Sequence, residues 1–202
     1  MSQPVMVAVL GAGAGARMGG GKLDRDLGGR PLGAWALATA QSLGAMVCFI
    51  SDGRRPGWVG PDVEVVHNPH AASGMASSLR LAVDRAQGCD AARLLIMLAD
   101  MPFVEAATLR MLLDRTAEDR VSACRYPDGR LGPPACFGAG RMASLAALTG
   151  DVGARHLLNQ PGFALALSID AAELQDIDTP EDLRLARLRA ASRMAGMPPS
   201  GH

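Results

Sequence analysis

Residues 5–32, VMVAVLGAGAGARMGGGKLDRDLGGRPL, are the stretch that decides the fold. The apolar run from Val5 to Leu10 predicts a buried parallel strand. A glycine-dense loop follows, and such a loop lets backbone N–H groups approach a ligand closely because glycine has no Cβ. Arg17 and Lys22 place two cations within this loop. Glycines and fixed cations directly after a strand suit a polyphosphate; a mobile loop with solvated charges is the structural alternative.

Two well-known phosphate-binding loops fit this stretch poorly. The dinucleotide fingerprint G-x-G-x-x-G/A is met by Gly11, Gly13 and Ala16. It also requires an acidic residue about 20 positions later, whereas the next strand-like run ends further on, near Ser51. The P-loop pattern fails because Leu23 stands where a hydroxyl would hold magnesium. A nicotinamide oxidoreductase therefore stays only as an alternative.

Length and charge limit the classes of protein that the chain can belong to. The 202 residues allow one domain, which we expect over residues 1–194, with a disordered tail at 195–202. The 20 basic and 20 acidic residues balance, which argues against nucleic acid and against a membrane surface as partners. Aromatic residues make up only 3% of the chain, so stacking on single-stranded nucleic acid is not expected either.

The N-terminus and the cysteines indicate the compartment. The start of the chain lacks the charged region and cleavage site of a secretory signal, and no apolar run approaches the roughly 20 residues that span a bilayer. The four cysteines form no C-x-x-C pair, so neither a zinc site nor a redox motif is indicated. We interpret Cys48 and Cys124 as small core residues. These features favour a cytoplasmic location.

Alternating apolar runs and helical patterns predict an α/β fold. We expect a three-layer α/β/α sandwich with a mostly parallel, Rossmann-like sheet. Strands are expected at 5–10, 46–50, 63–66, 93–99, 121–125, 133–137 and 163–169. Helices are expected at 31–43, from 77 onward, at 104–116, at 141–148 and from 180 onward, and the block at 150–155 is expected to lead into a further helical turn with Leu157 and Leu158. The excursion over residues 121–137, with its Asp-Gly turn, is expected to add an antiparallel edge.

Asp100 follows the most apolar strand, residues 93–99. A carboxylate at the carboxyl end of a central parallel strand lies where open α/β sheets bind ligands. Aspartate is a hard oxygen ligand that suits Mg²⁺ carrying substrate phosphates. A helix cap before residues 104–116 is the structural alternative.

The polar loop at 67–80, HNPHAASGMASSLR, leads into a helix pattern. Free N–H groups at such a helix start suit a base, a ribose or a phosphate. Ordinary capping by Ser73 or Ser77 is the alternative. His67 and His70 flank an Asn-Pro turn, and we interpret them as loop residues rather than as a metal pair.

Thr179 to Asp182 form a strong helix start, with a capping residue, proline at the first position and acids in the first turn. Capping alone explains these four residues. Asp178, just before the cap, is not explained by it. With Asp100 it could share one Mg²⁺ and leave coordination positions for phosphate oxygens.

Several separated blocks resemble one family. Leu10-Gly11-Ala12-Gly13, Arg17-Met18-Gly19, Lys22 and Gly28-Gly29-Arg30-Pro31-Leu32 are similar to the L-x-A-G-x-x-x-R-M-G-x-x-K…G-G-x-P-L motif of the MobA-like nucleotidyltransferase superfamily. The segments at 67–80, Asp100-Met101-Pro102, the Gly-Asp-x-Gly-Ala-Arg block at 150–155 and Asp176 to Leu183 extend the resemblance over about residues 5–190. Within the superfamily, the chain most resembles molybdenum cofactor cytidylyltransferases.

The resemblance implies a site. It makes Lys22, Arg17 and Asp100 catalytic, and Asp100 and Asp178 the ligands of Mg²⁺ or Mn²⁺. The residues that it places against the nucleotide are Leu10, Gly11, Ala12, Gly13, Gly15, Met18, Gly19, Gly74, Ser77 and Ser78.

The resemblance also implies a reaction. CMP would pass from CTP to a phosphorylated acceptor, molybdopterin or molybdenum cofactor, with release of pyrophosphate. The resemblance also implies that a molybdoenzyme or its chaperone could be a protein partner. The residues by themselves indicate only that the chain binds a polyphosphate together with a metal ion. A guanylyl- or sugar-phosphate nucleotidyltransferase and a non-catalytic cofactor carrier therefore stay as alternatives.

The chain departs from the family pattern at two places that bear on the site. Asp24-Arg25-Asp26 replaces an apolar segment after the lysine, and Gly132-Pro133-Pro134 replaces Gly-His-Pro on the acceptor side. At the block 150–155, Asp151 is expected to cap a helix and pair with Arg155. The alternative is that Arg155 reaches an anionic acceptor.

Overall fold

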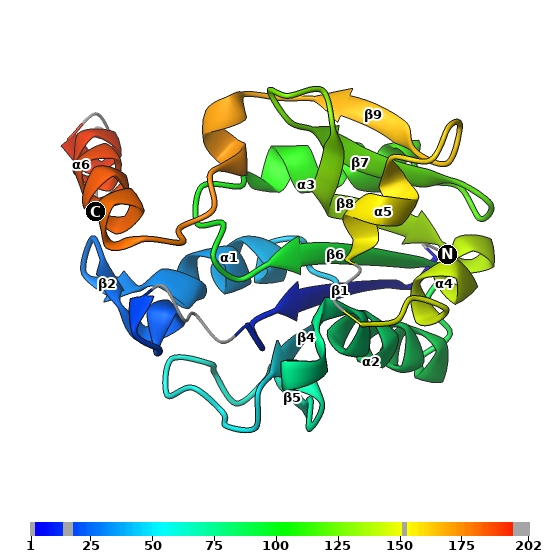
Figure 1. Ribbon diagram of the computed structural model, residues 1–202, viewed down its shortest axis with the longest axis horizontal. Helices are drawn as coiled ribbons and strands as arrows, with labels where there is room; N and C mark the ends of the chain where they lie inside the picture. The colour runs from blue at the N-terminus through cyan, green and yellow to red at the C-terminus, as the bar shows by residue number, and fades with distance from the viewer. Residues whose placement is uncertain (1–2, 14–17, 151–152, 196–202) are drawn as a thin grey trace.

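A computed structural model describes residues 3–13, 18–150 and 153–195. Its centre is a seven-stranded sheet with the order β5-β4-β1-β6-β8-β7-β9 (Figure 1). The strands are β1 (Val5–Leu10), β4 (Met46–Ser51), β5 (Glu64–His67), β6 (Arg93–Leu98), β7 (Val121–Arg125), β8 (Leu131–Gly138) and β9 (Leu165–Ser168). A separate two-stranded hairpin joins β2 (Asp26–Leu27) to β3 (Arg30–Pro31). The mostly parallel sheet predicted from the sequence is confirmed.

The antiparallel strand lies inside the sheet and not at its edge, so that prediction is wrong. β8 pairs antiparallel with β6 on one side and with β7 on the other. β9 then pairs parallel with β7 and forms the edge. The turn at 126–130 returns the chain so that β8 fills the position beside β6, and its eight residues are all buried there.

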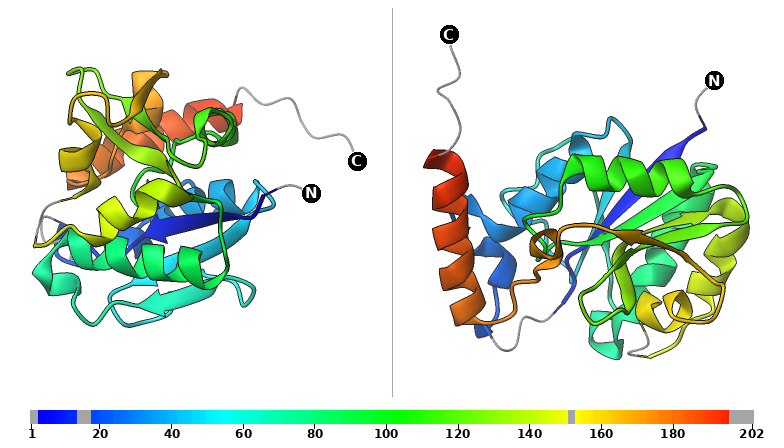
Figure 2. Two further views of the ribbon diagram at one scale, coloured as in Figure 1. Left: turned by 90° about the vertical axis from the view of Figure 1, so that its right-hand side faces the viewer. Right: turned by 90° about the horizontal axis from the view of Figure 1, so that it is seen from above.

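Helices cover both faces of the sheet. They are α1 (Leu32–Gln41), α2 (Met75–Gly88), α3 (Ala106–Arg115), α4 (Ala139–Ala146), α5 (Ala154–Leu158) and α6 (Pro180–Ala195), with single 3₁₀ turns η2 (Lys22–Asp24), η3 (Ala71–Ser73) and η4 (Ala171–Leu174). Alternate residues of β1 point to opposite faces. Met6, Ala8 and Leu10 pack with α2, α4 and α5. Val7 and Val9 pack with α1 and α3. The result is the predicted three-layer sandwich (Figure 2).

α6 stands apart from these layers and packs beside the β2–β3 hairpin (Figures 1 and 2). Met18, Leu27 and Ile177 are buried in the cluster between them. Thr179 caps this helix as predicted: its Oγ1 accepts a hydrogen bond from the Asp182 N–H at 3.1 Å, and Asp182 Oδ2 accepts one from the Thr179 N–H at 2.8 Å. The end of the glycine loop and the segment before α6 are therefore held on one apolar cluster. Of the predicted tail, residues 196–202 lie outside the described part of the chain.

Candidate active site

Lys22, Asp100 and Asp178 meet although they lie far apart in the sequence. Lys22 Nζ donates to Asp100 Oδ2 at 2.6 Å and to Asp178 Oδ1 at 2.8 Å. Asp100 lies two residues beyond the end of β6. Because β6 is the parallel neighbour of β1, the carboxyl end of β6 lies beside the glycine loop. The Ile177 N–H donates to the Asp100 carbonyl at 3.0 Å and brings Asp178 to the same point.

Lys22 is held as a cation between the two carboxylates. Only 11% of its side chain is exposed. Burial alone would lower the pKa of Lys22, but the charge of Asp100 and the hydrogen bonds to Asp100 and Asp178 outweigh it, so the pKa lies above 10.5. Lys22 is also the only lysine in the sequence. A fixed positive charge therefore sits where a triphosphate would meet the carboxylates.

Asp100 has one oxygen that the fold leaves unused. Its Oδ1 is buried and has no hydrogen-bond partner in the described structure. Such an atom is costly unless a cation or a donor arrives. The residues described contain no group of three or more histidine, cysteine or acidic side chains suited to a metal. Asp100 and Asp178 thus fit a hard cation whose other ligands are substrate oxygens and water.

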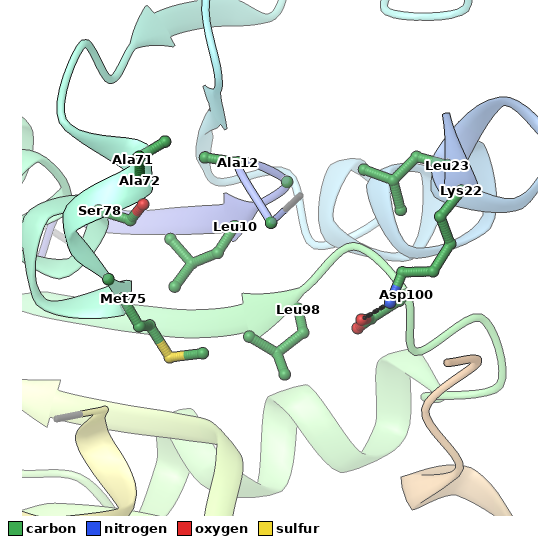
Figure 3. Close-up of a pocket in the computed structure, with 13 residues that line it drawn as sticks. Leu10, Ala12, Lys22, Leu23, Ala71, Ala72, Met75, Ser78, Leu98 and Asp100 are labelled. Carbon is green, nitrogen blue, oxygen red and sulfur yellow. Dashed lines mark hydrogen bonds and ion pairs between the residues drawn. The ribbon is translucent and has the colours of Figure 1, made fainter. Parts of the chain in front are cut away.

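A cavity of about 500 Å³ opens beside this cluster (Figure 3). Its lining comes from the end of β1, the glycine loop, η2, η3, the start of α2 and the end of β6. The lining residues are Leu10, Gly11, Ala12, Gly13, Lys22, Leu23, Ala71, Ala72, Gly74, Met75, Ser78, Leu98 and Asp100. A cavity with a largely apolar wall and a few polar groups suits a small ligand such as a nucleotide.

The glycine loop has a geometry that other residues would not allow. Gly19, Gly20 and Gly21 have consecutive φ values of +71°, +83° and +61°. This left-handed path carries the chain into η2, where Lys22 points back to the carboxylates. At Gly11, a Cβ would collide with the ring of Phe49. The loop can therefore lie directly on β4 and leave its backbone facing the cavity.

Most of the predicted site residues come together. Eight line the cavity, namely Leu10, Gly11, Ala12, Gly13, Lys22, Gly74, Ser78 and Asp100. Asp178 contacts this group by accepting a hydrogen bond from Lys22 Nζ. Arg17 and Gly15 lie outside the described residues. Met18 does not line the cavity but is buried under α6, and Gly19 is exposed in the turn that follows it.

The two capping alternatives are wrong. Gly74 and Glu105 precede α2 and α3, and neither helix has a side-chain cap at that position. Ser77 Oγ donates instead to the carbonyls of Gly74 and His70. Ser73 Oγ donates to the His70 carbonyl at 2.7 Å. Asp100 is engaged by Lys22, so none of Ser73, Ser77 and Asp100 serves as the cap of the following helix.

Asn68 is a supporting residue that sequence reasoning did not place in the site. It is 1% exposed, and its Nδ2 donates to Ser77 Oγ and Ser78 Oγ at 2.9 Å each. Its Oδ1 accepts from the His70 N–H. In the sequence, the Asn-Pro pair before the Gly/Ser loop could have pointed to this role of Asn68. The five other lining residues that were missed, Leu23, Ala71, Ala72, Met75 and Leu98, are apolar and carry no such signal.

The unusual acidic residue after the lysine has a structural partner. Asp24 accepts from Arg54 at 2.5 Å and from the Trp58 indole N–H at 2.8 Å. Trp58 packs edge-on against Phe49, with ring centroids 5.3 Å apart. The loop after β4 is thereby tied to η2, the turn that carries Lys22. A second hollow of about 50 Å³ lies between them.

Removing the charge of Asp24 is expected to weaken this tie in a pH-dependent way. Burial would raise the pKa of Asp24, but the hydrogen bonds from Arg54 and Trp58 outweigh it and hold the pKa below 3.8. The stabilisation is therefore present above pH 3.8 and lost as the pH falls through the folded-state pKa. Asp24→Asn should cost up to about 1 kcal/mol of unfolding free energy near neutral pH, because the pair is solvent-exposed.

Urea denaturation of the native chain and of Asp24→Asn at about pH 6 and about pH 3 checks this expectation. Asp26→Asn is the matched control, because Asp26 is an exposed neighbour in the same segment. The expectation would be contradicted if the free energies of unfolding of the native chain and Asp24→Asn differed as much at the acidic pH as near neutrality.

Comparison with known proteins identifies the fold and the class of enzyme. Residues 7–165 match the model of the MobA-like NTP transferase domain. The chain belongs to the MobA-like NTP transferase family. It is 30% identical over 203 residues to the purine catabolism protein PucB of Bacillus subtilis (strain 168). The aligned region covers 93% of this chain and 98% of PucB. This MobA-like chain is a nucleotidyltransferase, and the oxidoreductase alternative is wrong.

Solved structures show the same fold as this MobA-like chain. Rv0371c from Mycobacterium tuberculosis H37Rv superimposes with a TM-score of 0.78 at 27% identity, covering 93% of this chain and 100% of that one. The same protein has been solved in complex with manganese, with a TM-score of 0.73, 26% identity and the same coverage. A nucleotidyl transferase from Methanothermobacter thermautotroptrophicus has a TM-score of 0.79 at 24% identity, covering 95% of this chain and 100% of its own.

No helix among the residues described in this MobA-like chain combines the length and the apolar character needed to cross a bilayer.

Proposed function

We propose that the chain transfers CMP from CTP to the phosphate group of a molybdopterin-type acceptor and releases pyrophosphate. The observation that carries the proposal is the Lys22 bridge between Asp100 and Asp178 at one end of the cavity beside the glycine loop. Family membership supports the transfer itself, and the resemblance to cytidylyltransferases supports the choice of CTP and acceptor. Residues 1–194 would form the catalytic unit as a single domain.

The reaction balances without a general base. An oxygen of the acceptor phosphate, already ionised, forms a bond to the α-phosphorus of CTP. The bond between the α-phosphorus and the oxygen that bridges to the β-phosphate breaks, and its electron pair leaves with pyrophosphate. Lys22 would neutralise the charge that develops on the leaving group, with Arg17 as the second predicted cation. Positioning and neutralisation would therefore supply most of the rate.

Asp100 and Asp178 would hold Mg²⁺ or Mn²⁺. The unpartnered Oδ1 of Asp100 supports this role, as does the manganese complex of Rv0371c. A bound divalent cation supplies charge neutralisation and orients phosphate oxygens. For it to engage both carboxylates, the Lys22 ammonium would have to release them and turn toward the phosphates.

Gly11, Ala12, Gly13 and the start of α2 would hold the nucleotide. Ser78 Oγ accepts from Asn68 and faces the cavity, which leaves its own proton for a base or ribose oxygen. The name of PucB supports a setting in purine catabolism. A molybdoenzyme or its chaperone as protein partner, and the cytoplasm as location, remain predictions from the sequence.

Pyrophosphate release from CTP, GTP, ATP and UTP, each with Mg²⁺ and molybdopterin, tests the proposal. We expect CTP to be preferred. Preference for GTP would instead support the guanylyl-transferring alternative. Molybdopterin binding without pyrophosphate release from any nucleotide would favour the cofactor carrier and contradict the proposed reaction.

A further inference from the structure

Arg155 of α5 and Tyr126, in the turn between β7 and β8, form a stacked pair. The Arg155 guanidinium carbon lies 4.9 Å from the centroid of the Tyr126 ring. Gly132 permits this stacking, because a Cβ there would lie 2.8 Å from Tyr126 Cε2 and 3.1 Å from Arg155 Nε. Arg155 itself is exposed. The pair thus presents a cation on a rigid aromatic support.

The pair lies at the same end of the sheet as the carboxylates. Ile96 of β6 pairs with Ala135 of β8, and because the strands are antiparallel, Pro133 lies toward the carboxyl end of β6. The Tyr126 hydroxyl donates to the Pro133 carbonyl at 2.7 Å and lies 3.9 Å from Met101 Sδ, one residue beyond Asp100. A continuous path of contacts therefore joins Asp100 to Arg155.

The start of α5 packs against a residue of the cavity wall. A Cβ at Gly153, two residues before Arg155, would lie 3.1 Å from Met75 Sδ, and Met75 lines the cavity. Arg155, in the first turn of α5, therefore lies beside the wall of the cavity.

We propose that Arg155, supported by the Tyr126 ring, binds the phosphate group of the acceptor. The inference rests on the proposed transfer to a phosphorylated acceptor, and it names the residue that recognises this phosphate. Asp100 and Asp178 lie together at the proposed point of transfer, so an anionic acceptor needs a cation on its own side. The planar guanidinium suits a phosphate, which it can hold by two parallel hydrogen bonds.

A phosphate titration tests the inference without requiring turnover. Tyr126 is the only tyrosine in the sequence, so ring-labelled tyrosine gives the NMR signals of one residue. We expect inorganic phosphate, at matched ionic strength, to shift these signals saturably in the native chain. Arg155→Ala should weaken the response by about 10- to 100-fold, as expected for loss of a charge-assisted contact. Arg155→Lys should restore part of it.

Arg85→Ala is the matched control, because Arg85 is an exposed arginine whose carboxylate partner, Glu64, lies on the outer strand β5. It should respond to phosphate as the native chain does. Thermal unfolding of each variant shows whether it is folded. No response of the native chain, or an equal response in Arg155→Ala, would overturn the inference.

A kinetic measurement separates this inference from the proposed function. With CTP and molybdopterin, Arg155→Ala should raise the KM for molybdopterin by about 10- to 100-fold and leave the KM for CTP close to native. Equal acceptor KM values in the two proteins would overturn the inference and leave the proposed function standing. If the native chain releases no pyrophosphate, the proposed function fails, and the phosphate titration alone decides the role of Arg155.

Discussion

Asp100→Asn is expected to lower the rate of pyrophosphate release by about 10²- to 10³-fold, the loss typical of removing one electrostatic contact that stabilises the transition state. The amide keeps the shape of the carboxylate but removes its charge. It also replaces a cation ligand with N–H donors at a point where Lys22 already presents a positive charge, 2.6 Å from Oδ2. The unpartnered Oδ1 makes Asp100 the carboxylate with the most to gain from a metal.

The measurement is pyrophosphate release at saturating CTP and acceptor over a range of Mg²⁺ concentrations. Asp84→Asn serves as control, because Asp84 is an exposed aspartate on α2. We expect the control to match the native chain, and Asp100→Asn to require more Mg²⁺ as well as turning over slowly. A rate within about tenfold of native at every Mg²⁺ concentration would remove Asp100 from the catalytic role.

Lys22→Met is expected to have opposite effects on catalysis and on metal binding. Methionine has a similar length and no charge, so the phosphates lose a neutralising cation and transfer should fall by at least about 10²-fold. At the same time the two carboxylates lose the ammonium that bridges them at 2.6 and 2.8 Å. Mn²⁺ should then bind more tightly without nucleotide, because it no longer competes with Lys22 for the same oxygens.

The transfer assay measures the expected loss of rate, and calorimetric titration with Mn²⁺ alone measures the expected gain in metal affinity. Lys22→Arg is the informative comparison, because it keeps the positive charge and should not tighten Mn²⁺ binding. Since Lys22 is the only lysine, lysine-selective methylation reports on this residue and on the N-terminal amine alone. Weaker Mn²⁺ binding in Lys22→Met would show that Lys22 does not occupy the place of the metal.

Local patterns were enough to predict the elements of the fold. The runs of four to seven residues that predict strands became β1, β4, β5 and β6, because strand formation depends largely on the residues within each run. Thr179 caps α6 because a cap is satisfied within one turn. The position of Asp100 at the end of β6 followed from the rule that ligands meet the carboxyl ends of parallel strands.

The placement of β8 shows the limit of such patterns. Residues 121–137 predict two strands and a turn, and two strands and a turn are present. Which of the two pairs with β6 depends on side chains elsewhere in the sheet, so the antiparallel strand came out inside the sheet and not at its edge. The same applies to Asp24, whose partners Arg54 and Trp58 lie about 30 residues away in a loop without regular structure.

The sequence by itself determined the order of strands and helices, the glycine loop and the identity of the polar residues at the strand ends. Only the tertiary structure decided that the ammonium at position 22 bridges carboxylates 78 and 156 residues further on, and that Asn68 holds Ser77 and Ser78 at the start of α2. The reason is physical: strands and caps are stabilised by near neighbours, whereas a charge cluster exists only after the folded chain has brought distant segments together and excluded water between them.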